Sequence, residues 1–180
     1  MKRDFVNCSA IIYDEKGNEL ANAQILEYDR NRNTIVVDDK FALDNRQYCE
    51  LMILTTPAPL AYKGTIHKHN SYQKLIALFK EHTRENRSEA RYKVNLTANV
   101  KHLIYDNKAY AMHTAIDAQV IDLSTKGLRI RSVPNALAKG NIFQISVNNQ
   151  NSTNLLYADV KYCVNPSPNH SEYGCRFLNK

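Results

Sequence analysis

Residues 92–101, YKVNLTANVK, alternate strictly between apolar and polar side chains, and this alternation constrains the fold more than any other feature of the chain. A period of two indicates a β-strand that buries one face and leaves the other in water. Five more strand-like runs follow, at residues 110–123, 127–133, 141–148, 154–164 and 172–179. Six strands in under ninety residues, without a helical period among them, predict a six-stranded antiparallel barrel over residues 87–180.

The first 69 residues are also built from short strand-like runs separated by polar turns. The runs cover residues 5–13, 19–28, 33–38, 47–55 and 60–68. Gly17 lies in the first turn, DEKGN, where a glycine can supply a positive φ. Five strands at this spacing predict a small barrel-like β domain over residues 1–69.

The hydrophobic period changes in residues 70–86, NSYQKLIALFKEHTREN. Four large apolar side chains recur there at the spacing of one helix face: Tyr72, Leu75, Ile76 and Phe79. Asn70 is a suitable N-cap, and Gln73 follows it at the distance of a capping box. We therefore expect a mainly all-β fold in which a helix over residues 70–86 connects two small antiparallel barrels.

Positive charge is concentrated in the second half of the chain. Residues 1–83 contain 11 Lys and Arg against 11 Asp and Glu, whereas residues 84–180 contain 13 against 7. The whole formal net charge of +6 therefore belongs to the C-terminal part. This asymmetry favours an anionic partner for that part, although a basic surface kept for solubility has the same composition.

The sequence also indicates where the protein works. We read no signal peptide at the N-terminus and no apolar run long enough to span a bilayer. The four cysteines form no CxxC pair, so we expect reduced thiols, a cytoplasmic protein and no metal site. His67 and His69 alternate at a strand end, but no third ligand accompanies them. Neither a phosphate-binding glycine loop nor a nucleophile elbow is present, and we expect no enzymatic activity.

Two arginines four residues apart, Arg87 and Arg91, precede the alternating strand in the segment RENRSEARYKVNL. Each guanidinium offers a planar fork of donors that matches a phosphate or the O6/N7 edge of guanine. At this spacing the two side chains can converge on one ligand. The alternative is structural, because arginines at a helix end also interact with the helix dipole and could pair with Glu85 and Glu89.

The second motif is DLSTKG, residues 122–127, which lies between two predicted strands. Asp122 or Ser124 could turn back onto the backbone, and Gly127 could take a positive φ, so a purely structural hairpin turn explains the pattern. A binding role explains it as well. An ionised Asp122 only accepts hydrogen bonds, which suits the adjacent N1–H and N2–H₂ donors of guanine. Together, the two motifs indicate a guanine nucleotide held on the outside of a barrel.

The motifs R-x-x-x-R, as RSEAR, and D-x-S-x-x-G, as DLSTKG, resemble those of the PilZ domain, a bacterial receptor for cyclic di-GMP. The closing segment EYGCRFLN, with Gly174 and Phe177, resembles the last strand of that family, so the resemblance covers roughly residues 84–180. It implies a six-stranded barrel whose ligand is cyclic di-GMP. The order and size of the N-terminal part resemble the β domain that precedes PilZ in flagellar-brake-type receptors.

Carried over by position, the resemblance implies that Arg87 and Arg91 hold phosphate and guanine. It also implies that the DLSTKG residues form the opposite wall: Asp122, Ser124 and Gly127. Arg129 could add favourable potential for an anion. Many members have another arginine before the first motif arginine, where this chain has Asn86, so we expect one ligand per chain. Arg84, one helical turn back, could substitute for the missing arginine.

The resemblance implies a receptor that changes its inter-domain arrangement or its partner surface on binding. Its partner would be a protein of the flagellar motor or of the polysaccharide machinery, with motility, surface attachment or exopolysaccharide as the regulated process. Two alternatives stay open: a basic nucleic-acid-binding β-barrel, and a PilZ-like protein-interaction module without a ligand. We do not favour nucleic acid, because the tyrosines are not interleaved along the chain with basic residues.

Overall fold

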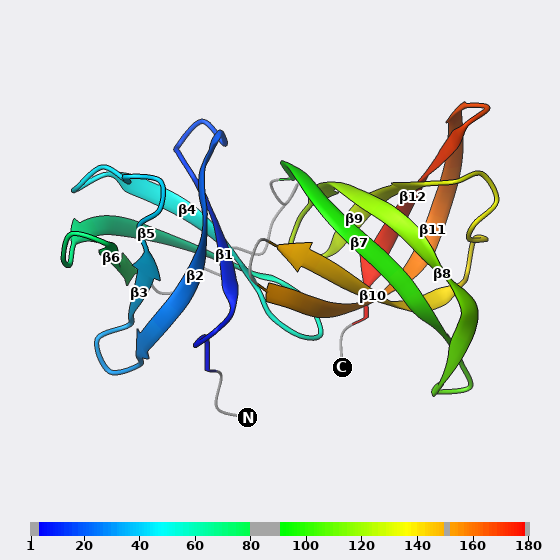
Figure 1. The fold of residues 1–180 in the computed structure, drawn as a ribbon, viewed down its shortest axis with the longest axis horizontal. Coiled ribbons are helices and arrows are strands. Elements are labelled where there is room, and N and C mark those ends of the chain that lie inside the picture. Colours follow the sequence, from blue (N-terminus) through cyan, green and yellow to red (C-terminus); the bar gives the residue numbers. More distant parts are fainter. Residues whose placement is uncertain (1–3, 80–90, 150–151, 179–180) are drawn as a thin grey trace. The chain divides into compact units, whose positions relative to one another are not determined.

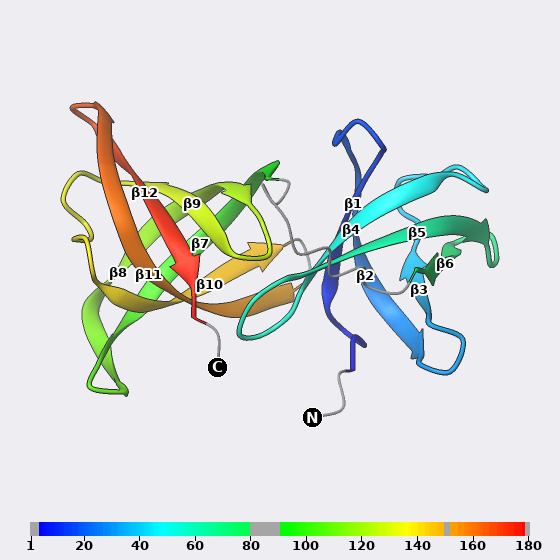
Figure 2. The ribbon, with the colours of Figure 1, turned by 180° about the vertical axis from the view of Figure 1, so that it is seen from behind.

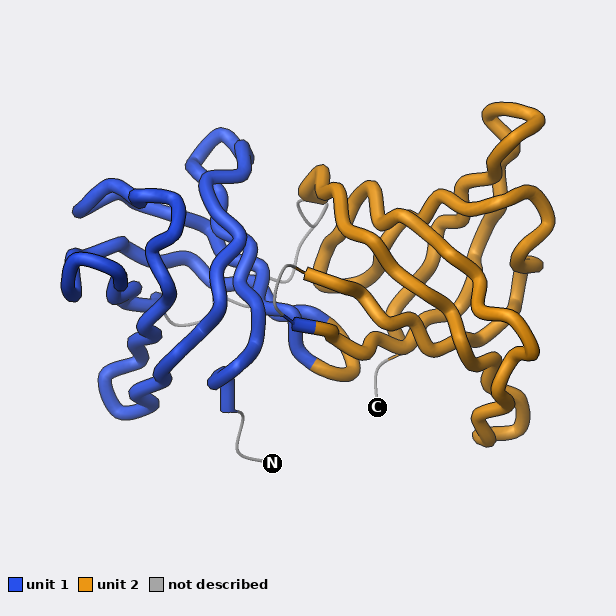
Figure 3. The backbone as a smooth tube through the Cα atoms, viewed as in Figure 1, with its two compact units in different colours: residues 1–55, 59–88, 150–152 blue, residues 56–58, 89–149, 153–180 orange. Residues whose placement is uncertain are grey.

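The computed structural model describes residues 4–79, 91–149 and 152–178, and its regular elements there are all β-strands (Figures 1 and 2). These residues fall into two compact units (Figure 3). Unit 1 takes its residues from 1–55, 59–88 and 150–152. Unit 2 takes its residues from 56–58, 89–149 and 153–180. None of the described segments forms a helix of the length and apolar character that crossing a membrane requires.

Unit 1 is a closed antiparallel barrel with the strand order β1-β2-β3-β6-β5-β4. Its strands are β1 (Ser9–Tyr13), β2 (Glu19–Asp29), β3 (Thr34–Asp38), β4 (Tyr48–Leu54), β5 (Leu60–Lys68) and β6 (Gln73–Leu78). Inward-facing apolar residues from all six strands form one core, in which Ile12, Ile53 and Ile76 are fully buried. Gly17 has a φ of +80° in the turn between β1 and β2, which confirms the sequence-based expectation.

The predicted helix over residues 70–86 is wrong where the structure describes that segment, because residues 73–78 form strand β6. This strand pairs with β3 on one side and with β5 on the other. Buried and partly buried residues alternate along it, as a strand requires, and Tyr72 is 81% exposed instead of sharing an apolar face with Ile76. Asn70 still caps a turn, since its carboxamide oxygen accepts a hydrogen bond from the Tyr72 amide. Residues 80–86 lie outside the described residues.

Unit 2 is the predicted six-stranded antiparallel barrel, closed in the order β10-β11-β12-β9-β8-β7. Its strands are β7 (Tyr92–Tyr105), β8 (Lys108–Leu123), β9 (Gly127–Ser132), β10 (Ile142–Asn149), β11 (Ser152–Ser167) and β12 (His170–Phe177). The alternation that begins at Tyr92 is visible in its burial, because Val94, Leu96, Ala98 and Val100 point into the core. The fold class predicted from the sequence, two small all-β barrels, is therefore confirmed.

Candidate functional site

Asp122, the first residue of the DLSTKG motif, is turned to the outside of unit 2 by a β-bulge. In the ladder between β8 and β9, Val120 lies opposite Ile130 and Asp122 lies opposite Arg129, so β8 has one extra residue, Ile121. Without the bulge, Asp122 would share the inward face of Val120, since side chains alternate with a period of two. The bulge shifts this alternation and places the carboxylate beside an outward-facing arginine.

Both carboxylate oxygens of Asp122 accept hydrogen bonds from arginines. Arg91 donates from Nη1 to Oδ1 at 3.1 Å, and Arg129 donates from Nε to Oδ2 at 2.7 Å. Asp122 is only 6% exposed, whereas the side chains of Arg91 and Arg129 are 52% and 40% exposed. The carboxylate therefore lies between two guanidiniums that remain partly in contact with water.

The ion pairs continue across the sheet to β12. Arg129 donates from Nη1 to Oε2 of Glu172 at 3.4 Å, and Arg131 donates from Nη2 to Oε1 of the same residue at 2.7 Å. The hydrogen bond from Arg131, with the positive charges of Arg129 and Arg131, lowers the pKa of Glu172 below its ordinary value. Arg91, Asp122, Arg129, Glu172 and Arg131 thus form a chain of alternating charge, which we call the charge row.

Ser124 is buried and serves the hairpin turn itself. Its Oγ accepts hydrogen bonds from the amides of Lys126 at 3.3 Å and Gly127 at 3.2 Å, and it lies within donating distance of the Gly127 carbonyl. The Ser124 amide also donates to that carbonyl at 2.9 Å. The structural interpretation of this part of the motif therefore holds, and the turn fixes the end of β8 where Asp122 lies.

Gly127 is needed for a different reason from the predicted one. The structure records a positive φ for Gly17 and Gly140 but not for Gly127. A Cβ at position 127 would lie 2.2 Å from the carbonyl oxygen of Cys175 on β12, far inside van der Waals contact. The expectation of a positive φ at Gly127 is wrong, and close packing of β9 on β12 explains the residue.

The structure thus brings together three residues that the sequence singled out, Arg91, Asp122 and Arg129. Arg84 and Arg87 lie outside the described residues. Glu172, which connects two of the arginines, was missed because nothing near it in the sequence points to β9. The sequence does contain the closing segment EYG around Glu172. Only the strand order reveals that this segment pairs with the Arg129–Arg131 segment.

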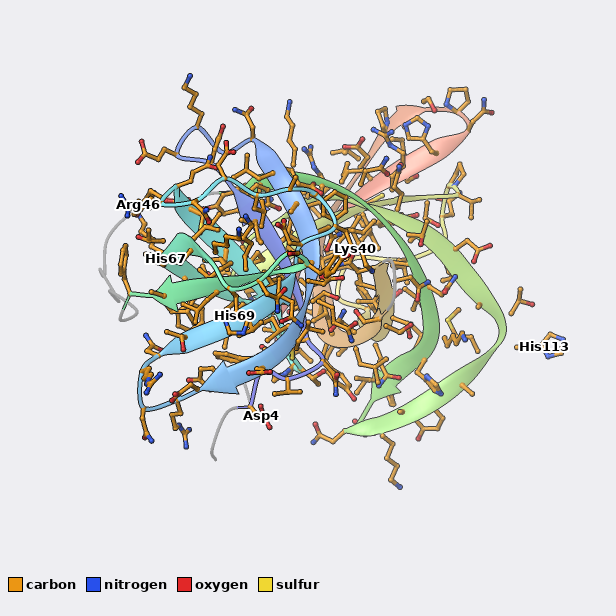
Figure 4. All side chains as sticks on the ribbon, turned by 60° about the vertical axis from the view of Figure 1, so that its left-hand side comes forward. Asp4, Lys40, Arg46, His67, His69 and His113 are labelled. Atoms are coloured by element: carbon orange, nitrogen blue, oxygen red, sulfur yellow. The ribbon has the colours of Figure 1, made fainter. Side chains whose placement is uncertain are left out.

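Other candidate groups do not assemble in the described part of the chain. There, no three side chains of His, Cys, Asp or Glu gather closely enough to hold a metal ion. His67 and His69 lie at the end of β5 in unit 1, and His113 projects outward from β8 in unit 2 (Figure 4). Burial raises the pKa of the Cys49 and Cys175 thiols to about 12, so neither is suited to act as a thiolate nucleophile near neutral pH.

The charge row has the chemistry of a two-sided recognition surface. Its guanidiniums can hold a phosphate or an acceptor edge of a base, and its carboxylates can accept from a row of donors. In the free protein these groups satisfy one another. A ligand must therefore exchange with existing ion pairs and must offer both kinds of partner.

The chain matches a protein family and is similar to several solved structures. Residues 85–180 match the PilZ domain family. No curated protein matches the chain. Similar solved structures include MotI/DgrA, an inhibitor of motility from Bacillus subtilis, with 10% identity and a TM-score of 0.39 over 98% of this chain and 90% of that one.

Two more similar structures are complexes with c-di-GMP. YcgR from Escherichia coli has 15% identity and a TM-score of 0.39, over 96% of this chain and 76% of that one. MrkH from K. pneumonia has 11% identity and a TM-score of 0.38, over 97% of this chain and 80% of that one. The match to the family covers more than half of the 180 residues and includes every member of the charge row. This chain belongs to the PilZ domain family.

Proposed function

We propose that unit 2 is a receptor for cyclic di-GMP and that it acts without catalysing a reaction. The observation that carries this proposal is the position of Asp122, a nearly buried carboxylate held between two arginines on the outer face of the barrel. Membership of the PilZ family supports the choice of ligand. The charge row supplies partners for both halves of a guanine nucleotide, its anionic phosphate and its donor edge.

In this proposal the ligand binds by exchange. The N1–H and N2–H₂ groups of guanine donate to Asp122, and they replace the bond that Arg91 makes to Oδ1 in the free protein. The released guanidinium of Arg91 then holds a phosphate or the O6/N7 edge of guanine. Arg129 keeps its carboxylate partners and adds positive potential. Ser124 and Gly127 hold the turn that forms the wall of the site.

Arg87 is the second arginine of this site in our proposal, and Arg84 a possible third contact. Because Asn86 stands where many members of the family have another arginine, we propose one bound ligand per chain. A dianionic dinucleotide held by Arg87 and Arg91 would fix the segment that joins β6 to β7.

We further propose that this fixing is the output signal. The motif arginines lie in the chain between the last strand of unit 1 and the first strand of unit 2. Free energy for a change of inter-domain arrangement or partner surface can come only from a difference in ligand affinity between two states. The read-out would pass to a protein partner in motility, surface attachment or exopolysaccharide production.

Isothermal titration of the full chain with cyclic di-GMP tests the proposal. We expect saturation at one ligand per chain and a clear loss of affinity in Arg91→Ala. Absence of binding, or equal binding by the variant, would overturn the proposed site. Saturation at two ligands would overturn only the stoichiometry. Small-angle scattering with and without ligand tests the output, and an unchanged profile at full saturation would leave a composite surface of ligand and barrel as the signal.

A parallel titration separates this function from nucleic-acid binding. A protein that neutralises several phosphates of single-stranded nucleic acid loses affinity steeply with salt, with a log–log slope of about −0.7 per contact. Asp122 and Glu172 already pair with Arg91, Arg129 and Arg131, so this face offers less free positive charge than the sequence suggests. We expect weak binding of a single-stranded oligonucleotide and a shallow salt slope for cyclic di-GMP.

A further inference from the structure

A second line of paired residues starts from Asp122 and Arg129 and crosses two more strands. Arg129 on β9 lies opposite Gly174 on β12, and Gly174 lies opposite Tyr162 on β11. The neighbours of Arg129 along β9, Leu128 and Ile130, are fully buried, so Arg129 and its partners face outward. One line across the outer sheet therefore runs from a carboxylate through a guanidinium to a bare glycine and a tyrosine.

Tyr162 reaches the outer face through a second β-bulge. Val160 lies opposite Cys175 and Tyr162 lies opposite Gly174, so β11 has one extra residue, Lys161. Val160 is 1% exposed, and a regular strand would send Tyr162 to the same inward face. Asp122 and Tyr162 lie at the two ends of this line across the strands, and each is turned outward by a one-residue bulge.

The ring of Tyr162 lies directly against Gly174. A Cβ at position 174 would lie 2.1 Å from both Cε1 and Cζ of the tyrosine, so only glycine leaves room for the ring at this place. Tyr162 is nevertheless 44% exposed. The ring therefore rests on the backbone of β12 and presents a good part of its surface to solvent beside Arg129.

The spacing of the sheet sets what this surface can contact. Neighbouring strands lie about 4.8 Å apart, so a ring over Gly174 is one strand from Arg129 and two strands from Asp122. A purine is wide enough to lie on the ring while its edge reaches Arg129. Aromatic side chains bind bases of any sequence through their faces, and cations next to the ring add to the attraction.

We propose that Tyr162 is a further ligand-contacting residue, whose exposed ring is a stacking platform for a guanine base of the ligand. This inference rests on the proposed function of unit 2 and adds a residue that neither PilZ motif contains. The dinucleotide would have one base at Asp122 and the other on Tyr162, with Arg129 between them. The glycine and the bulge are then features that prepare the platform before the ligand arrives.

A purely structural role for Tyr162 predicts different results. Aromatic rings cover strand glycines in order to stabilise the sheet, and a ring with only that role needs bulk and not an aromatic face. Tyr162→Leu keeps an apolar side chain over Gly174 but removes the ring, whereas Tyr162→Phe keeps the ring. We expect Tyr162→Leu and Tyr162→Ala to bind cyclic di-GMP about tenfold more weakly than the wild type, and Tyr162→Phe to keep the wild-type affinity.

The chain contains no tryptophan, which allows a direct optical test. Tyr162→Trp places the only indole of the protein on the platform, and Tyr110→Trp places it at another exposed tyrosine, on the part of β8 remote from Asp122. On addition of cyclic di-GMP we expect the tryptophan fluorescence at position 162 to be quenched until it saturates. The ligand concentration at half-quenching should agree with the dissociation constant from calorimetry, and the fluorescence at position 110 should show no comparable change.

The outcomes distinguish the two proposals. If the wild-type protein does not bind cyclic di-GMP in the calorimeter, the proposed function fails. If it binds, but Tyr162→Leu binds as tightly as Tyr162→Phe and the indole at position 162 does not respond, the platform is overturned while the function stands. Equal quenching at positions 162 and 110 would also overturn the platform.

Discussion

Asp122→Asn is the substitution that tests the candidate site most directly, because it keeps the size of the side chain and removes its charge. The asparagine has one acceptor oxygen where the carboxylate has two. Arg91 donates to this side chain at 3.1 Å and Arg129 at 2.7 Å, and one of these two donors must then meet an NH₂ group in place of its acceptor. In the complex, the donor edge of guanine would meet the same amide.

The expected magnitude follows from these contacts. A hydrogen bond to a charged group contributes roughly 1.5–3 kcal/mol, so loss of one such bond to guanine weakens binding by about 2 kcal/mol. In the Arg91–Asp122 pair the arginine side chain is 52% exposed although the carboxylate is nearly buried, and a pair open to water on one side contributes about 1 kcal/mol that the ligand no longer has to displace. The net loss is about 1–2 kcal/mol, or roughly 5- to 30-fold in affinity.

Isothermal titration with cyclic di-GMP measures this loss, and Asp117→Asn is its matched control. Asp117 lies on the same strand, is exposed, and accepts a hydrogen bond from Asn99 at 2.7 Å. Both variants change the net charge by the same amount, so a general electrostatic effect would appear in both. Affinity of Asp122→Asn within twofold of wild type, or an equal loss in Asp117→Asn, would refute the assignment of Asp122.

Three further predictions test the surroundings of Asp122. Gly127→Ala should lower the free energy of unfolding by about 1–3 kcal/mol in urea titrations, because its Cβ would overlap the Cys175 carbonyl. Gly140→Ala meets no atom within 4 Å, has only backbone strain from a φ of +88°, and should cost less. The pKa of Glu172 is lowered in the folded protein, so its ionised carboxylate stabilises the fold fully above the ordinary pKa of 4.5. This stabilisation should be lost as the pH falls below 4.5, and acid unfolding should show the loss in the wild type but not in Glu172→Gln. Cyclic di-AMP should bind far more weakly than cyclic di-GMP in calorimetry, because the adenine edge presents an acceptor to Asp122 where guanine presents a donor.

The sequence predicted both barrels because their strands alternate locally, and it failed at β6 because that segment is ambiguous. In residues 72–79 the apolar side chains fit a helical face, yet Lys74, Ile76 and Leu78 also fit one face of a strand. Lys74 obscured this second pattern, since a lysine is rarely buried. In the structure its ammonium pairs with Asp39 at 3.3 Å, with both side chains nearly buried. The segment is a strand because it pairs with β3 and β5, and this pairing cannot be seen in the local sequence pattern.

The candidate site was predictable only where it lies in the two motifs or directly beside them. Asp122, Arg91 and Arg129 could be named from the sequence, whereas Glu172 and Tyr162 enter through strand pairing with β9 and β12. The tyrosines are separate from the basic residues along the sequence, and the strand pairing brings them together. Across the strands, Tyr162 and Arg129 are separated only by Gly174. Bulges at Ile121 and Lys161 add to the difficulty, because each reverses the inside–outside alternation on which such predictions depend.

The charge row also explains how a basic barrel could be selective. The excess of positive charge in residues 84–180 suggests a surface that attracts any anion. In the structure, however, three arginines of this surface are already paired with Asp122 and Glu172. A simple anion could take a guanidinium only by removing one of the two arginine partners of a nearly buried carboxylate, which is costly. A ligand that brings an anion for the arginine and a donor edge for the carboxylate leaves neither group unpaired, and selectivity then follows from the requirement for both.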